Sequence, residues 1–174
     1  LFALTVVEPM MVGIFGAGMS TIRLADGSHH FINNYSVAPQ AATDTMFETL
    51  SDTWPDYQDV KGRKNDIGVL ATGVPGTLKG WTETLQQWGT FPLDQVMAPS
   101  IRYAQHGFLA THYLSEIIQL FAKDIARFES TAATWMPNGE PIQPGERVIQ
   151  TDYANLLKTI ATQGPDVLYG GALG

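Results

Sequence analysis

The histidines and serines of this chain do not fall into a recognisable catalytic or metal-binding set. The histidines are His29, His30, His106 and His112. None lies in a His-Glu-x-x-His motif, in which two histidines bind zinc and the glutamate acts as a base. No serine lies in the Gly-x-Ser-x-Gly turn of a nucleophile elbow. The chain has no cysteine, which excludes thiolate metal sites, disulfides and a cysteine nucleophile. The residues by themselves predict no catalytic residue, no metal and no cofactor in this chain.

A glycine-rich stretch at residues 13–18 reads Gly-Ile-Phe-Gly-Ala-Gly. It differs from the dinucleotide-binding fingerprint, because the order of the glycines is different and a strand, not a helix, is predicted to follow. Glycine allows the backbone to approach a neighbouring segment closely. We therefore expect a tight backbone path that leads into a strand.

Composition narrows the possible function classes. The 174 residues suffice for one domain with a core, and the net charge of −7 argues against nucleic acid or a polybasic membrane contact. No run approaches the roughly 18 apolar residues of a membrane span. Charged residues make up only 16%, which suggests that part of the surface meets another chain. Because the sequence starts without Met inside an apolar run, we expect a processed or partial product.

The pattern of elements predicts an α+β fold, one β-hairpin followed mostly by helices. Asp26-Gly27 separates two strand-like runs, residues 19–24 and 29–34, which is a hairpin signal. Apolar spacing predicts helices over residues 41–50, 78–88, 92–106 with an interruption at Pro99, 112–128 and 152–163, with loops over 51–65 and 135–145. Thr77 and Thr151 are predicted to cap two of these helices. Since a lone hairpin is marginally stable, further strands are expected from a partner.

Several motifs resemble the γ-glutamyltranspeptidase family in order and spacing, and the resemblance covers nearly the whole chain. They are Val6-Val7-Glu8-Pro9, the glycine run, Arg23-Leu24-Ala25-Asp26-Gly27, Gly73-Val74-Pro75-Gly76-Thr77, Trp88-Gly89-Thr90-Phe91-Pro92-Leu93, Ala98-Pro99-Ser100-Ile101-Arg102-Tyr103-Ala104 and Gln163-Gly164-Pro165-Asp166.

The resemblance implies an N-terminal nucleophile hydrolase with an αββα sandwich. In that family a precursor cleaves itself, and the new N-terminal threonine of the small subunit attacks a γ-glutamyl amide with its own amine as base. Residues 1–174 would be the N-terminal part of the large subunit, a single domain incomplete without downstream chain. The implied partners are the small catalytic subunit and a small-molecule γ-glutamyl or acyl-amide substrate. Family members are often exported, which favours a periplasmic or secreted protein over a cytoplasmic one.

One substrate-binding position of the family falls inside this chain. Family members carry an arginine shortly before Ala-Pro, and it holds the α-carboxylate of the γ-glutamyl group. Here Ala38-Pro39 fixes the register and Tyr35 occupies the arginine position, flanked by Asn34 and Ser36. A phenol offers one donor and no positive charge. We expect these three residues to bind substrate, with Phe15 adding bulk nearby.

Three functions are open at this point. The first is an acylase, because Tyr35 suits an acyl group with less charge at the end that this residue would contact. A related acylase branch accepts such a group, the glutaryl side chain of a cephalosporin. Ordinary γ-glutamyl hydrolysis or transfer on glutathione-like substrates is the second, with another residue holding the carboxylate. The third is a catalytically inactive homologue with a binding or structural role.

Overall fold

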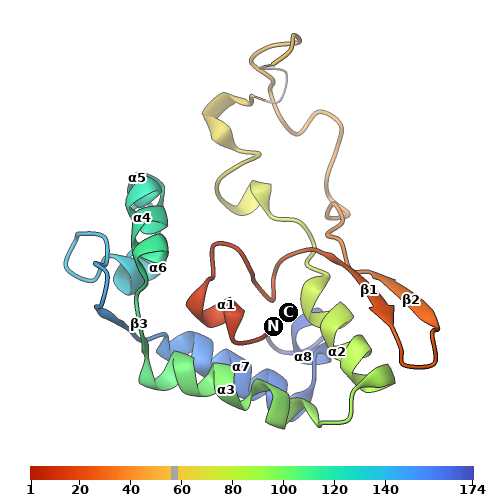
Figure 1. Ribbon diagram of the computed structural model, residues 1–174. Helices are drawn as coiled ribbons and strands as arrows, with labels where there is room; N and C mark the ends of the chain where they lie inside the picture. Colours follow the sequence, from red (N-terminus) through yellow and green to blue (C-terminus); the bar gives the residue numbers. More distant parts are fainter. Residues whose placement is uncertain (56–58) are drawn as a thin grey trace.

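The computed structural model describes residues 1–55 and 59–174 and shows a mixed α+β segment in which helices predominate. The longer helices are α2 (Thr77–Trp88), α3 (Leu93–His106) and α7 (Thr151–Gln163). Helices α3 and α7 lie side by side, and the short α1 (Leu4–Val7) packs on α3 (Figure 1). The hairpin contacts α2, so that α2 links the sheet to the helical part of the molecule.

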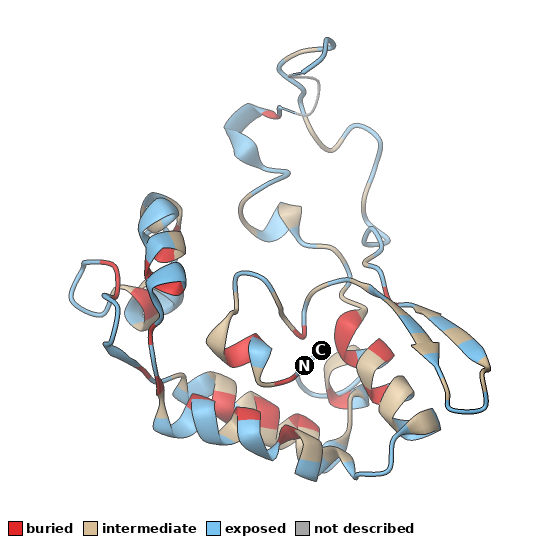
Figure 2. Cartoon of the chain, viewed as in Figure 1, coloured by how far each residue is buried: buried red, intermediate tan, exposed pale blue. Residues whose placement is uncertain are grey.

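The hydrophobic core includes the region where α1, α2, α3 and α7 meet, and it continues into buried residues between 108 and 148 (Figure 2). Buried side chains recur every three or four residues along α3 and α7, and they are Met97, Ser100, Ala104, Ala154, Leu157 and Ile160. This spacing places them on one face of each helix. Val6 of α1 and Leu78 of α2 are fully buried in the same cluster. Gln150 adds a polar link, since its Nε2 donates to the Val6 carbonyl at 2.8 Å.

The predicted hairpin is confirmed as β1 (Met19–Arg23) and β2 (His29–Asn33), paired antiparallel. Its turn is held by Asp26, whose Oδ1 accepts from the backbone N–H and the hydroxyl of Ser28. Alternate residues face α2, where the His30 ring lies 4.6 Å from that of Trp88. The opposite face is open, because Met19 and Phe31 are 63% and 61% exposed. The hairpin is therefore covered on one face only.

Short elements complete the chain. They are the helices α4 (His112–Leu120), α5 (Ala122–Ile125), α6 (Glu129–Trp135) and α8 (Asp166–Tyr169), the paired strands β3 (Phe108–Leu109) and β4 (Arg147–Val148), and the 3-10 helices η2 (Lys61–Arg63) and η3 (Val69–Ala71). Between β2 and α2 the chain leaves the core and runs mostly exposed (Figures 1 and 2). An ion pair of 2.9 Å between Arg63 and Asp124 connects this segment to α5.

Two predicted helix boundaries are wrong. Helix α3 continues through Pro99 instead of being interrupted there. Pro99 and Gln95 are both exposed, so water can hydrogen-bond the Gln95 carbonyl that loses its amide donor. The helix predicted over 112–128 breaks at Phe121, whose φ of −99° and ψ of 11° leave helical geometry. The following turn tightens, with the Asp124 N–H donating to the Phe121 carbonyl at 3.0 Å.

The helix predicted over residues 41–50 is also wrong. Its last residues pair across the segment, with the Leu50 N–H donating to the Asp59 carbonyl at 2.8 Å and the Lys61 N–H donating to the Glu48 carbonyl at 2.9 Å. The residues before them form local turns, such as the one in which the Met46 N–H donates to the Thr43 carbonyl at 3.3 Å. The predicted loop over 51–65 is irregular apart from η2, and residues 56–58 lie outside the described residues.

The predicted caps differ as well, because Thr77 and Thr151 are the first helical residues and not the caps. At the start of α2 the glycine run supplies the acceptor, since the Gly16 carbonyl accepts from the Thr77 N–H at 3.2 Å. The small β3–β4 ribbon and the short helix α8 were not predicted by the periodicity.

Candidate functional site

The end of β2 is held between the glycine run and the start of α2. Asn34 and Gly18 exchange backbone hydrogen bonds of 3.1 and 3.2 Å, which extend the hairpin by one pair. Val37 and Val74 form an isolated bridge with bonds of 2.8 and 3.3 Å. The backbone between these pairs carries the sequence-predicted residues Asn34, Tyr35 and Ser36, so their position is fixed at both ends.

Glycines let this strand end lie directly on α2. A Cβ on Gly76 would collide with the Asn34 carbonyl oxygen, and a Cβ on Gly80 would lie 2.5 Å from the Asn34 Cβ. Gly73 makes the same kind of approach to Ser36, where a Cβ would be 3.1 Å from the Ser36 Cβ. The close contact therefore requires glycine at positions 76 and 80, and backbone shape rather than apolar bulk joins β2 to α2.

Asn34 is buried in this joint and Tyr35 is not. Asn34 is 6% exposed, and its Oδ1 has no hydrogen-bond donor among the described residues. The hydroxyl of Thr77, equally buried at the start of α2, also has no partner in the described part of the chain. Buried polar atoms without partners are destabilising. Two such groups thus lie behind the strand end.

Tyr35 is 60% exposed and borders a pocket of about 330 Å³ between β2 and α2. Its backbone N–H donates to the Asn33 Oδ1 at 3.1 Å, a local turn that orients the residue. We call this cavity the Tyr35 pocket, and its polar lining consists of Asn33, Asn34, Tyr35, Lys79, Glu83 and Tyr169. Ser36 does not line it. The structure thus brings Asn34 and Tyr35 together in one cavity and leaves Ser36 against Gly73.

Sequence reasoning missed the other polar residues of this pocket. Lys79 and Glu83 lie four residues apart on α2, a spacing that puts them on one helix face. Tyr169 comes from α8, and its hydroxyl accepts from the Lys79 N–H at 3.2 Å. Burial raises the pKa of the Tyr169 phenol, so it stays protonated at neutral pH. The spacing of Lys79 and Glu83 within the predicted helix indicated that they share one face. Nothing local in the sequence indicated that Tyr169 lies beside them.

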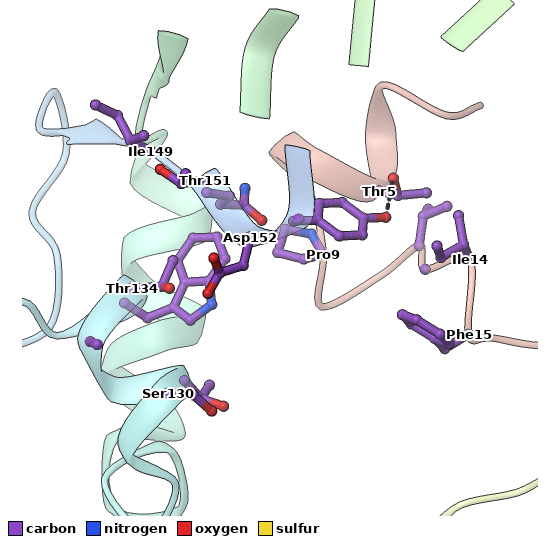
Figure 3. A pocket seen from close by; sticks show the side chains of 16 residues that line it. Thr5, Pro9, Ile14, Phe15, Ser130, Thr134, Ile149, Thr151 and Asp152 are labelled. Carbon is purple, nitrogen blue, oxygen red and sulfur yellow. Dashed lines mark hydrogen bonds between the residues drawn. The ribbon is translucent and has the colours of Figure 1, made fainter. Parts of the chain in front are cut away.

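A larger cavity, of about 640 Å³, is lined in part by the glycine run. In Figure 3, Ile14 and Phe15 face Ser130, Thr134 and Asp152 across it. Next to it the Tyr153 hydroxyl donates to Thr5 Oγ1 at 2.7 Å, and burial raises the Tyr153 pKa. Phe15 does not line the Tyr35 pocket. The two unusual residues, Phe15 and Tyr35, therefore border separate cavities.

Within the described residues, no group of three or more histidine and acidic side chains is placed to hold a metal ion. A membrane-crossing helix is not found in that part of the chain either, since none is long and apolar enough.

The Gamma-glutamyltranspeptidase family model matches residues 1–174, and the chain belongs to this family. It is 54% identical over 174 residues to the Acylase ACY 1 proenzyme of Pseudomonas sp. (strain SE83), covering all of this chain and 31% of that protein. It is 38% identical over 177 residues to the glutathione hydrolase proenzyme of Bacillus subtilis (strain 168), covering 98% of this chain and 28% of that protein. The chain thus spans about a third of the length of these relatives.

Solved structures are similar over almost the entire chain. The γ-glutamyltranspeptidase of Helicobacter pylori matches with a TM-score of 0.89 and 30% identity, over 99% of this chain and 48% of that one. The cephalosporin acylase of Bacillus halodurans matches with a TM-score of 0.81 and 25% identity, over 99% of this chain and 32% of that one. The fold of residues 1–174 is therefore that of the corresponding part of both proteins.

Proposed function

We propose that the full-length protein containing these residues is an amidohydrolase that removes glutaryl-type acyl groups from amides. The observation that carries this proposal is the 54% identity to an acylase proenzyme over the whole chain, against 38% to a glutathione hydrolase proenzyme. Tyr35 marks a departure from the family pattern at the position where an arginine would hold the head of a γ-glutamyl group.

The proposed chemistry is acyl transfer through an enzyme-bound ester. The N-terminal threonine of a small subunit, outside residues 1–174, attacks the amide carbon while its own amine takes the hydroxyl proton. The C–N bond breaks, the leaving amine takes up that proton, and the acyl group stays on the threonine oxygen. Water then attacks the ester carbon, and the free acid leaves as the hydroxyl regains its proton. Residues 1–174 contribute no nucleophile to these steps.

The hairpin suggests how this segment enters the complete fold. Its outer face exposes Met19 and Phe31, and within the described residues β1 and β2 pair only with each other. An exposed apolar face and two unpaired edges favour further pairing and packing. In the proposed αββα sandwich, strands from the rest of the large subunit and from the small subunit cover this face. Residues 1–174 are then one part of a domain that is completed by other segments.

The loss of the arginine at Tyr35 does not by itself explain a preference for glutaryl groups. A glutaryl group ends in a carboxylate at the same chain length as a γ-glutamyl group, and it lacks only the ammonium on the adjacent carbon. Both acyl groups therefore need a partner for a negative charge. Losing the arginine does not by itself separate the two substrates, and a cation elsewhere in the site is required for either.

Ordinary γ-glutamyl transfer is the second candidate, and two observations favour it. The H. pylori γ-glutamyltranspeptidase has a TM-score of 0.89 to this chain, against 0.81 for the B. halodurans cephalosporin acylase. The Tyr35 pocket also contains an acid, Glu83, that is suited to an ammonium group.

The test is a comparison of two substrates on the full-length protein. The protein is expressed with its downstream sequence, and kcat/KM is measured for glutaryl and γ-glutamyl p-nitroanilides after confirming cleavage into two subunits by gel electrophoresis. We expect cleavage and a higher kcat/KM for the glutaryl anilide. A higher value for the γ-glutamyl anilide would select the second candidate. An uncleaved protein without activity on either would indicate an inactive homologue.

A further inference from the structure

We propose that Lys79 of α2 binds the terminal carboxylate of the acyl group and so replaces the cation missing at Tyr35. This inference rests on the proposed function, because it places the head of the acyl group in the Tyr35 pocket. It names a specificity-determining residue and a ligand chemistry, a monoanionic carboxylate at the end of a short aliphatic chain.

The packing of β2 on α2 brings Lys79 to the right place. Gly76 and Gly80 are the contact points of α2 with Asn34, and Gly76 also lies close to the Tyr35 carbonyl oxygen. Lys79 precedes Gly80 directly, so its backbone lies within one residue of that contact. Both Lys79 and Tyr35 line the same pocket of about 330 Å³. The positive charge in this pocket therefore comes from Lys79 on α2 and not from a residue at the end of β2.

The charge of Lys79 is available for a ligand. Lys79 is exposed, it is the one lysine or arginine among the described residues that line the Tyr35 pocket, and no salt bridge to it is found in the described part of the chain. The hydroxyls of Tyr35 and Tyr169 add neutral donors to the same pocket. A carboxylate that accepts from an ammonium and a phenol makes charge-assisted hydrogen bonds, the stronger kind in proteins.

Two acidic residues lie near Lys79 and compete with a substrate carboxylate for its positive charge. Glu83 lines the Tyr35 pocket with it, and Asp166 lines the adjoining groove on the other side of Lys79. Neither forms a salt bridge with Lys79, and Glu83 lies on the same helix face. Neutralising Glu83 should therefore strengthen the attraction of Lys79 for a substrate carboxylate.

The experiment uses the full-length protein and substrates that differ only in the terminal carboxylate. Lys79→Ala, Lys79→Arg and Glu83→Gln are compared with Lys123→Ala, which removes an exposed lysine of α5 that lines none of these cavities. KM and kcat are measured for glutaryl and pentanoyl p-nitroanilides. Calorimetry measures the binding of glutarate and of pentanamide, which has no carboxylate, and this binding requires no catalysis.

We expect Lys79→Ala to weaken only the binding of ligands that carry the terminal carboxylate. Lys79→Ala should raise KM for the glutaryl anilide and Kd for glutarate by on the order of tenfold or more, the effect of losing a charge-assisted hydrogen bond. The pentanoyl anilide and pentanamide should be unaffected, Lys79→Arg should retain most of the affinity, and Glu83→Gln should lower KM for the glutaryl anilide.

Other outcomes separate the two claims. If Lys79→Ala leaves glutarate binding unchanged, or weakens glutarate and pentanamide equally, the inference is wrong while glutaryl hydrolysis by the wild type still supports the proposed function. If the wild type binds glutarate through Lys79 but hydrolyses no anilide, the proposed function is wrong and the carboxylate site stands.

Discussion

The helical part of the molecule and the hairpin with its following segment are stabilised in different ways. Helices α3 and α7 bury a continuous face on each other, whereas no residue of β1 or β2 is fully buried. The strand end at Asn34 is held by backbone hydrogen bonds and by close contacts at glycines Gly76 and Gly80. Of the residues that we propose to bind substrate, Tyr35 thus lies on the part of the chain with little core of its own, whereas Lys79 lies on α2.

This difference indicates a division of roles. The helical core fixes α2 in place, since Leu78 is buried in that core while Lys79 faces the Tyr35 pocket. The hairpin then lies on α2 and leaves its outer face free for strands from other segments. The end of β2 is precisely placed but weakly buried, so other segments of the protein can pack against it. Its side chains are not needed for the core, and they can therefore contact the substrate and determine specificity.

The largest effect should come from the helical core. Leu157→Ala removes a fully buried side chain between α7 and α3 and should lower the free energy of unfolding by about 2–5 kcal/mol. Leu120→Ala, at a leucine that is 72% exposed, is the matched control and should change little. Urea unfolding of the full-length protein, followed by circular dichroism, measures both. Equal effects of the two substitutions would contradict the assignment of the core.

The outer face of the hairpin gives the next effect. In the full-length protein Phe31→Ala should cost about 3 kcal/mol, because other strands are proposed to cover a side chain that is 61% exposed in residues 1–174. The same unfolding experiment measures it. A change within about 0.5 kcal/mol, as for an ordinary surface residue, would show that this face stays open.

The joint between β2 and α2 should respond to a single methyl group. Gly80→Ala places a Cβ 2.5 Å from the Asn34 Cβ and should destabilise the protein by about 1–3 kcal/mol. Gly170→Ala is the control, because nothing lies within 4 Å of a Cβ there. In the background of Asn34→Gly, where the clashing Cβ is gone, Gly80→Ala should be tolerated better. Full additivity of the two substitutions would argue against this contact.

The ion pair that connects the exposed segment to α5 should have the smallest effect. Hydrogen bonding to Arg63 lowers the pKa of Asp124, so the stabilisation is complete above the ordinary aspartate pKa of about 4 and disappears as the pH falls through the lower, folded-state value. Asp124→Asn should therefore reduce stability slightly at pH 7, and the difference from wild type should vanish in acid. Thermal unfolding from pH 7 down to pH 2 follows this. A difference that persists at the lowest pH would rule out the charge as its cause.

Local patterns predicted the hairpin and helices α2 and α7, because Asp26-Gly27 and the apolar spacing of Leu78 and Leu157 act over a few residues. They failed where long-range pairing decides the backbone. Residues 48–50 pair with residues 59–61 across the exposed segment. The helix break at Phe121 is a separate failure, since Phe121 itself belongs to the apolar period that predicted a continuous helix. At the site, the register of Ala38-Pro39 led to Tyr35 and Asn34. It did not lead to Tyr169, because 90 residues separate it from Lys79 and only the packing of α8 brings them together.

The central claim is that the end of β2 and the start of α2 form the subsite for the head of the acyl group. A crystal structure of the processed full-length protein with glutarate tests it most directly. We predict one glutarate carboxylate in the Tyr35 pocket, within hydrogen-bond distance of the Lys79 Nζ and of the Tyr35 or Tyr169 hydroxyl. Glutarate bound with both carboxylates away from this pocket, for example in the cavity beside Phe15, would contradict the claim.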